Sequence, residues 1–508
     1  MPTKQIFFTF AKRVRAFWRK NSTFCMADQL KEKTAKGLFW GTINNGVTQV
    51  LNLVIGIVLG RILTPHDYGL VGMLTIFTAI AGNLQNFGFT NALVNMKEPK
   101  DNDYNAVFWF NILTSLALYT ILFFSAPLIA RYFHQPQLVA LSRVVFLSFV
   151  CAAVGIACSG YLFKNLMNRE IAIASIVALI VSGTTGIILA LKGFAYWSLA
   201  VQQIVYILVA NLIRFYYCPW RPSFRIDFTP IKRMFNFSVK ILITNIINTI
   251  SGNILTVIFG RIFPANTVGN FTQANKWNTM AYTFVGNSLG QVAQPVLASI
   301  NDDSDREKRV FRKMMRFTAF LSFPCLLGLA LVANEFISVT ITDKWAASVP
   351  LLRTLCVGGA FMPFYTLYQN LAISHGRSDV YMRCNIAQVC LQIAVILLFM
   401  RQGIETMVVA YTIFNILWLL VWHLATRRFI GLHLAEVLKD IVPFAGAAAV
   451  VMVATWFATR CIANQWLLLL ARIALAVVLY VLIMKLTRAR IYKECVAFLF
   501  QRFKKTAQ

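Results

Sequence analysis

Five lysine and arginine side chains fall inside long apolar stretches of the chain, where a charge facing lipid is costly. They are Arg143, Lys240, Lys276, Arg353 and Arg472. No aspartate or glutamate lies deep in the same stretches. Guanidinium and ammonium groups pair well with phosphate oxygens. Cations without acidic partners in these positions therefore indicate a cavity for an anionic substrate.

The five cations differ in what their positions imply. Arg143 and Arg353 occupy matching places in the two halves of the chain and are the first candidates for contact with an anion. The alternative is that they extend along the helix to the membrane interface. Lys240 and Lys276 lie near the starts of their stretches and could do the same. Arg472 lies in a late stretch, where we expect a packing or lipid contact.

Neutral polar residues recur on one helical face in the first apolar stretch. Separations of three, four and three residues place this set on one side of a helix: Thr42, Asn45, Gln49 and Asn52. Asn245 and Gln273 belong to the equivalent stretches of the second half. Two interpretations stay open: these side chains line a hydrated central cavity, or they make ordinary hydrogen bonds between membrane helices.

Nothing in the chain predicts catalysis. The five histidines show no metal-binding spacing, and no nucleophile–base pair or phosphate-binding loop is present. The ten cysteines are scattered and are typical of small buried hydrophobic residues. We therefore expect neither an enzyme nor a bound cofactor or metal.

The elements that must position these residues are membrane helices. Of the 508 residues 58% are hydrophobic and 13% charged, more apolar surface than one soluble core can bury. The sequence predicts an all-α polytopic membrane protein with fourteen spans of about 20 or more residues. The predicted spans are 37–62, 68–89, 106–133, 138–163, 171–191, 195–217, 235–262, 268–299, 310–341, 348–375, 380–400, 404–426, 441–460 and 465–486.

The basic residues predict the orientation of these spans. Most of the 48 lysines and arginines fall in alternate connections and in the two terminal segments, which this bias places in the cytoplasm. The opposite loops carry one each: Arg61, Arg131, Lys192, Arg261, Lys344, Arg401 and Arg460. The net charge of +29 is thus explained by membrane topology, and binding of nucleic acid is not expected.

A short repeat divides the chain into two lobes. Leu59-Gly60-Arg61-Ile62 returns as Phe259-Gly260-Arg261-Ile262, each copy just after a span and each followed by a further glycine. Internal repeats of this kind are typical of transporters built from two halves around a central site. Because both copies fall at the outer ends of spans, we expect Gly60, Arg61, Gly260 and Arg261 to be gate or structural residues.

Six segments follow from these patterns. We predict a basic cytoplasmic arm at 1–36, an N-lobe of six helices at 37–217, a cytoplasmic connection at 218–234 and a C-lobe of six helices at 235–430. Two extra helices occupy 431–486, and a basic cytoplasmic tail occupies 487–508. Residues 1–25 either form an interfacial helix or precede a translation start at Met26.

Several motifs resemble bacterial polysaccharide transporters of the Wzx type. The motifs that carry the resemblance are Lys31-Glu32-Lys33-Thr34, Gly37-Leu38-Phe39-Trp40, the stretch 59–73, the stretch 268–277, Gln294-Pro295-Val296-Leu297 and Asp343-Lys344-Trp345. Each is loose, and their order and spacing make the set specific. The resemblance covers about residues 26–486 and is strongest to the lipopolysaccharide-biosynthesis branch.

The resemblance implies the two-lobed fold of the multidrug/oligosaccharidyl-lipid/polysaccharide (MOP) exporters. It implies a flippase for undecaprenyl-diphosphate-linked oligosaccharide in the bacterial inner membrane, in contact with membrane lipids and with the polysaccharide polymerase machinery. Cavity cations would bind the anionic headgroup, for which Arg143 and Arg353 match best by position. A multidrug antiporter of the same fold is the alternative, although it would favour a buried carboxylate. A membrane polymerase is the second alternative.

Overall fold

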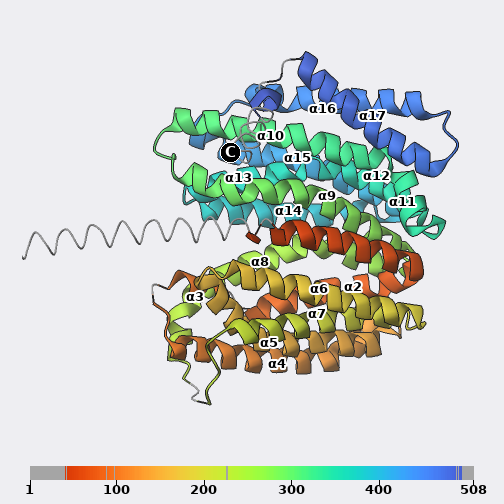
Figure 1. Ribbon diagram of the computed structural model, residues 1–508. Coiled ribbons are helices and arrows are strands. Elements are labelled where there is room, and N and C mark those ends of the chain that lie inside the picture. Colours follow the sequence, from red (N-terminus) through yellow and green to blue (C-terminus); the bar gives the residue numbers. More distant parts are fainter. Residues whose placement is uncertain are drawn as a thin grey trace, which may run out of the picture.

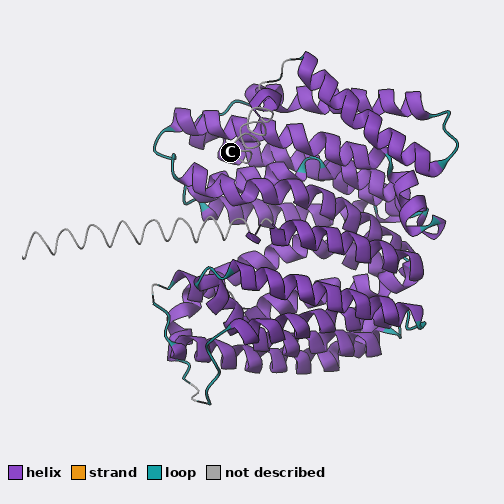
Figure 2. Cartoon of the chain, viewed as in Figure 1, coloured by secondary structure: helices purple, strands orange, loops and turns teal. Residues whose placement is uncertain are grey.

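The computed structural model describes residues 40–494 except positions 42, 87, 88, 97, 225, 226, 488 and 490. The described residues are helical, apart from connections and two short 3-10 turns, and none forms a strand (Figure 2). The predicted N-terminal arm and the end of the C-terminal tail lie outside the described residues.

The described residues of the N-lobe form seven helices, one more than the six predicted, because a short extra helix follows the second long one. The first runs over Ile43–Ile62. The others are α2 (Pro65–Asn86), α3 (Phe89–Asn95), α4 (Asp101–Phe133), α5 (Leu138–Lys164), α6 (Asn168–Leu191) and α7 (Tyr196–Tyr217). In Figure 1 α4 to α7 lie in the lower half of the molecule.

The C-lobe begins with two long helices, as the N-lobe does. It contains α8 (Thr229–Ile262), α9 (Ala265–Ala298), α10 (Ser304–Leu331), α11 (Ala333–Ile341), η1 (Asp343–Trp345), α12 (Ser348–Gly359), α13 (Met362–Ser374), α14 (Ser378–Leu398), η2 (Met400–Gln402) and α15 (Ile404–Ile430). Two further helices, α16 (Leu434–Thr459) and α17 (Gln465–Leu486), lie along the outside of this lobe in Figure 1.

Eleven described helices are long and apolar enough to cross a membrane. The remaining three predicted spans coincide with α8, with α9 and with the pair α12–α13. The predicted span 348–375 is interrupted at Ala360 and Phe361, and α13 begins at Met362 with Pro363 in its first turn. Proline has no N–H to donate within a continuous helix, and it fits at a helix start where that donor is not needed. The predicted span 310–341 is likewise divided, at Val332, into α10 and α11.

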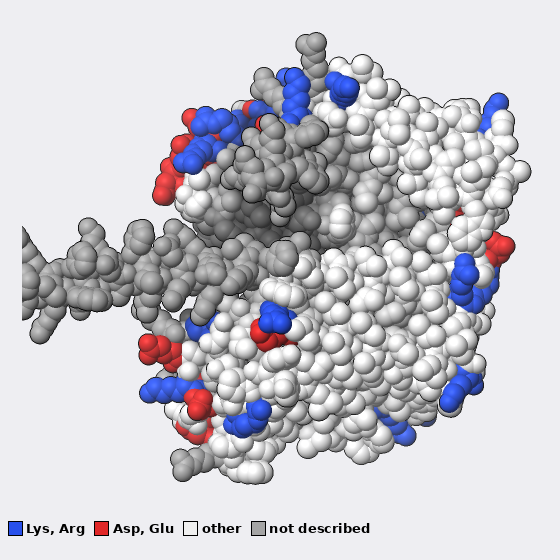
Figure 3. Space-filling view, viewed as in Figure 1, with Lys and Arg blue, Asp and Glu red and all other residues white. Residues whose placement is uncertain are grey.

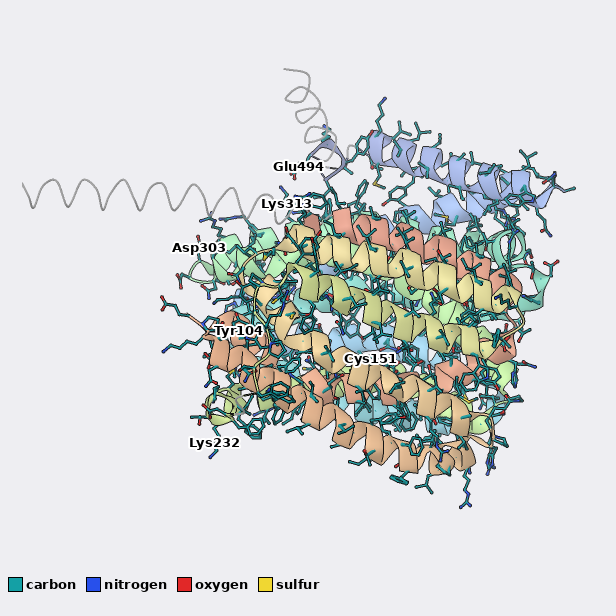
Figure 4. All side chains as sticks on the ribbon, turned by 60° about the horizontal axis from the view of Figure 1, so that its bottom comes forward. Tyr104, Cys151, Lys232, Asp303, Lys313 and Glu494 are labelled. Atoms are coloured by element: carbon teal, nitrogen blue, oxygen red, sulfur yellow. The ribbon has the colours of Figure 1, made fainter. Side chains whose placement is uncertain are left out.

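Charged and apolar surfaces separate as a membrane protein requires. In Figure 3 lysine, arginine, aspartate and glutamate gather at the two ends of the helices, and an uncharged band lies between them. Lys232, Asp303, Lys313 and Glu494 lie at one of these ends, whereas Cys151 lies midway along the bundle (Figure 4). Large apolar side chains such as Phe124 in α4 are exposed at the protein surface, where lipid would cover them in a membrane.

Several ion pairs attach the extra helices to the C-lobe, and they include the buried carboxylates of Glu335 and Asp440. Arg472 of α17 lies 2.8 Å from Glu335 of α11, and both side chains are buried. Arg312 of α10 donates two hydrogen bonds to buried Asp440 of α16. Arg472 therefore makes an internal ion pair, in place of the expected packing or lipid contact.

Candidate functional site at the interface of the lobes

Two glycines bring α2 and α9 into backbone contact across the lobes. A Cβ atom on Gly69 would lie 1.9 Å from the carbonyl oxygen of Ala265, and one on Gly269 would lie 1.7 Å from that of Pro65. No side chain fits at either distance, so only glycine permits this approach. The contact is reciprocal: each lobe presents its glycine to the first residue of the other lobe's helix.

The repeated arginines extend this reciprocal contact. Arg61 reaches α11 in the C-lobe, where it donates to the carbonyls of Thr340 at 2.6 Å and Val339 at 2.7 Å. Arg261 reaches α4 in the N-lobe, where it donates to the carbonyl of Tyr132 at 2.8 Å and contacts His134. The last carbonyls of a helix lack hydrogen-bond donors within that helix. Each arginine donates hydrogen bonds to such carbonyls at the end of a helix in the opposite lobe.

Gly60 and Gly260 sit beside these arginines and are closely packed. A Cβ on Gly60 would lie 2.7 Å from Ile341 of the C-lobe, and one on Gly260 would lie 2.8 Å from Phe133 of the N-lobe. The carbonyl of Gly60 also accepts a hydrogen bond from the Trp345 indole at 2.8 Å. We call the contacts of Gly60, Arg61, Gly69 and their counterparts Gly260, Arg261 and Gly269 the outer closure.

Lys344 completes the closure on one side. Its ammonium donates to the carbonyl of Arg61 at 2.6 Å. Desolvation lowers the pKa of Lys344, and the charge of nearby Asp67 opposes that shift. This contact has no described equivalent around Arg261, so the closure is symmetric in its glycines and arginines but not in every contact.

Lys276 lies between the lobes on α9. It is the twelfth residue of that helix, about 16 Å from the helix start at 1.5 Å per residue. A Cβ on Gly56 of the first helix would lie 2.8 Å from its ammonium nitrogen. The ammonium also lies 5.7 Å from the ring centroid of Tyr68 and 5.5 Å from that of Trp277, within range of cation–π attraction. Among the described residues no carboxylate pairs with it.

The amides predicted for a cavity separate into two groups. Gln49 and Gln273 lie between the lobes: Gln49 donates to the carbonyl of Met280 at 3.1 Å, and buried Gln273 has no described hydrogen-bond partner for its amide. Asn45 and Asn245 are exposed. The carbonyl of Asn245 accepts a hydrogen bond from Asn83 across the lobes at 3.4 Å.

The two arginines favoured by the sequence lie apart. Arg143, near the start of α5, is partly buried with its guanidinium 4.2 Å from the centroid of the Phe123 ring. Arg353, near the start of α12, is exposed. Neither lines the two cavities described next. The side chain of Lys240 lies outside the described part of the structure.

The described residues enclose a cavity within each lobe, on either side of the interface. The N-lobe cavity, of about 440 Å³, lies between the first helix, α6 and α7 and includes Asn52 and Gln202 in its lining. The C-lobe cavity, of about 410 Å³, lies between α8, α9 and α12 to α15. No charged side chain among the described residues lines either cavity. Sequence reasoning missed the C-lobe cavity, although Asn275, Asn278 and Thr279 on one face of α9 are a signal for it.

The chain is similar in sequence to a known protein family and to characterised relatives. A model of the family described as polysaccharide biosynthesis protein matches residues 58–350. The lipopolysaccharide biosynthesis protein WzxC of Escherichia coli K12 is 26% identical over 73% of this chain and 75% of its own length. The teichuronic acid biosynthesis protein TuaB of Bacillus subtilis is 24% identical over 69% and 73%.

Solved structures share the fold. The lipid II flippase MurJ in an inward closed conformation superposes with a TM-score of 0.73 at 14% identity, over 90% of this chain and all of MurJ. An inward-facing multidrug MATE transporter of the MOP superfamily gives 0.62 at 16% identity, over 75% and 94%. These likenesses confirm the predicted all-α, two-lobed MOP fold. Since the family model spans more than half of the sequence, the chain belongs to the polysaccharide biosynthesis protein family.

Proposed function

We propose that this protein is a flippase that moves undecaprenyl-diphosphate-linked oligosaccharide across the bacterial inner membrane for surface polysaccharide synthesis. Its substrate would be bound between the lobes and released by alternating access, with both chain termini in the cytoplasm. The names of its relatives support this role: one is a lipopolysaccharide biosynthesis protein and another, ExoT of Rhizobium meliloti, a succinoglycan biosynthesis transport protein.

Lys276 is the observation that carries the proposal. Its depth of about 16 Å along α9 is close to the middle of a hydrocarbon core about 30 Å thick. Arg143 and Arg353 are each the sixth residue of their helices, so they lie much nearer a helix start. A cation at half depth, between two lobes and without a described carboxylate partner, is well placed to bind an anion, whose charge would offset its desolvation. A diphosphate supplies that charge.

The outer closure supports alternating access. Its arginines and glycines all lie at the end of the lobes that the distribution of basic residues assigns to the periplasm. Release of the headgroup on that side requires these cross-lobe contacts to separate. Because each arginine donates to carbonyls at a helix end and to no described carboxylate, separation exposes hydrogen-bonding groups that water can satisfy. The closure can therefore open without leaving a charge unpaired in lipid.

The test replaces Lys276 in a strain that depends on this protein for its surface polysaccharide. Lys276→Met keeps the length of the side chain and removes the charge, whereas Lys276→Arg keeps the charge. We expect Lys276→Met to lower translocation at least tenfold, the loss of one charge-assisted contact. Lipid-linked oligosaccharide should then become accessible to a glycosidase only in inside-out vesicles. Lys276→Arg should retain most activity.

Arg353→Ala is the matched control because Arg353 is exposed and lines neither cavity. Normal surface polysaccharide in Lys276→Met, at a normal amount of protein in the membrane, would refute the role of Lys276.

A multidrug antiporter is the second candidate, favoured by the likeness to the MATE transporter. Drug-resistance assays on the same strains separate the two: a flippase mutant accumulates lipid-linked sugar without a change in drug sensitivity.

A further inference from the structure

The polar side chains that line the C-lobe cavity are all neutral among the described residues. Asparagine and glutamine amides and tyrosine, serine and threonine hydroxyls surround its volume of about 410 Å³, without a charged side chain. That volume falls within the range of small-molecule sites. The absence of charge in the lining distinguishes this cavity from the surroundings of Lys276. It makes the cavity a poor site for a phosphate and a good one for a neutral polar ligand.

Three polar groups in this lining have no hydrogen-bond partner among the described residues. They are Oδ1 of Asn278, Nδ2 of Asn385 and Oγ1 of Thr412. The three residues are 5%, 7% and 5% exposed. A buried polar group without a partner destabilises the protein. One acceptor, one donor and one hydroxyl in the wall of the cavity therefore lack partners, and a ligand that both donates and accepts can supply them once these side chains rotate toward it.

Other polar groups of the lining bond to one another. Gln388 donates to the amide oxygen of Asn415 at 3.0 Å, and Tyr365 donates to the backbone carbonyl of Asn415 at 2.6 Å. Gly359 leaves room for Asn278, since a Cβ there would lie 2.1 Å from the Asn278 amide oxygen. The hydrogen bonds to Asn415 fix the part of the lining contributed by α13, α14 and α15.

Helix α9 connects this cavity to Lys276. Gln273 and Lys276 lie on the face of α9 that contacts the first helix, whereas Asn275 and Asn278 lie on the face that lines the cavity. A ligand with a charged end and a neutral end could therefore contact both faces of one helix.

We propose that the C-lobe cavity is a subsite for a neutral sugar unit of the transported headgroup. Sugar hydroxyls donate and accept hydrogen bonds, as Asn278, Asn385 and Thr412 together require. The tyrosine rings of the lining offer apolar faces to sugar carbons. The inference rests on the proposed flippase function, because it assigns one part of the same substrate to one part of the site.

The experiment uses the purified full chain and a phosphate-free probe. The probe is the oligosaccharide released by mild acid from the lipid-linked precursor of the host, and its binding is measured by calorimetry. Asn278→Leu and Asn385→Leu remove amides at similar volume, and Thr412→Val removes the hydroxyl. We expect each to weaken binding of the probe about fivefold to tenfold, as loss of one neutral hydrogen bond predicts. Asn52→Leu in the N-lobe cavity is the matched control and should leave binding unchanged.

Thermal unfolding separates this role from a structural one. If the three groups await a ligand, replacing them with apolar side chains removes an unmet hydrogen-bonding demand and should raise the Tm of the unliganded protein. A lower Tm with unchanged probe binding would assign the amides to the fold and overturn the proposal. A higher Tm with unchanged binding would also overturn it, because the cavity would then hold only water.

The outcomes are distinguishable from failure of the proposed function. Lys276→Met should bind the phosphate-free probe as the wild type does, although it no longer transports the lipid-linked form. Probe binding that survives while no lipid-linked oligosaccharide is moved by the wild type would refute the flippase and leave the sugar site standing.

Discussion

The two lobes resemble each other where they meet and differ in the cavities that they enclose. At the outer closure, Gly69 and Gly269 make the same backbone contact, and Arg61 and Arg261 each donate to the end of a helix in the opposite lobe. The N-lobe cavity is lined by three helices and the C-lobe cavity by six. In our proposal the shared part serves movement, and the divergent part serves recognition of the substrate.

A helix break accounts for the difference between the cavities. In the N-lobe, α5 runs unbroken and packs tightly on α7: a Cβ on Gly155 would lie 1.9 Å from the Asn211 amide oxygen. In the C-lobe the corresponding span is divided into α12 and α13. Gly358 and Gly359, at the end of α12, line the cavity together with residues of α13. The interruption exposes polar groups of both segments to one enclosed volume.

The largest effect should follow from a methyl group at the closure. Gly69→Ala and Gly269→Ala each place a Cβ against a backbone carbonyl that cannot move without shifting a helix. We expect both to lower surface polysaccharide to near background and to do so equally. Gly82→Ala on α2 has open space around it and should be neutral. A normal Gly269→Ala strain beside a defective Gly69→Ala strain would show that the closure is not reciprocal.

Removing one closure arginine should have an intermediate effect. Arg61→Ala and Arg261→Ala each abolish carbonyl contacts across the lobes. Since both arginines are exposed, we expect each to favour the open form by only about 1 kcal/mol. A thiol reagent that labels a single cysteine introduced at the outer end of α2 would measure this opening, since labelling should be faster in the open form. Arg401→Ala is the control and should leave the labelling rate unchanged. Unequal labelling of the two variants would locate the closure mainly on one side.

The smallest effects should follow from a glycine-to-alanine substitution beside an asparagine in each lobe, and they should differ between the lobes. Gly155→Ala and Gly359→Ala each displace an asparagine amide, that of Asn211 or Asn278. Asn211 donates to the carbonyl of Cys151 at 2.8 Å. Gly155→Ala should therefore lower stability by about 1 kcal/mol and leave transport per folded protein intact. Gly359→Ala should lower transport severalfold with little change in Tm. Exchanged outcomes would place recognition in the N-lobe.

The sequence predicted correctly those features that depend on short stretches of the chain alone. The spacing of apolar residues predicted the long helices, and the repeated Gly-Arg-Ile predicted the halves, because both are local patterns. The starts of α10 and α16 were predicted several residues late. Their first turns contain Asp305, Glu307 and Glu436, and such charges hide a helix from a criterion based on hydropathy. Pro363 itself indicates a break between α12 and α13. A hydropathy criterion does not detect that break, because the apolar residues continue across it.

The candidate site was less accessible to inference because its members come from distant parts of the chain. Lys276 could not be ranked above Arg143 from sequence, since depth depends on where α9 begins and on which helix faces it. The contacts with Gly56 and Tyr68 join the first helix, α2 and α9.

The sequence by itself predicted a bundle of membrane helices in two lobes, an orientation favoured by its basic residues, and the repeated glycines and arginines. These follow from the cost of placing polar groups in lipid, which acts on each segment separately. Only the tertiary structure decided that α9 directs a lysine to one side and amides to the other. A single helix can present two polar faces only when its neighbours exclude lipid from both, and those neighbours are brought together by packing across the lobes.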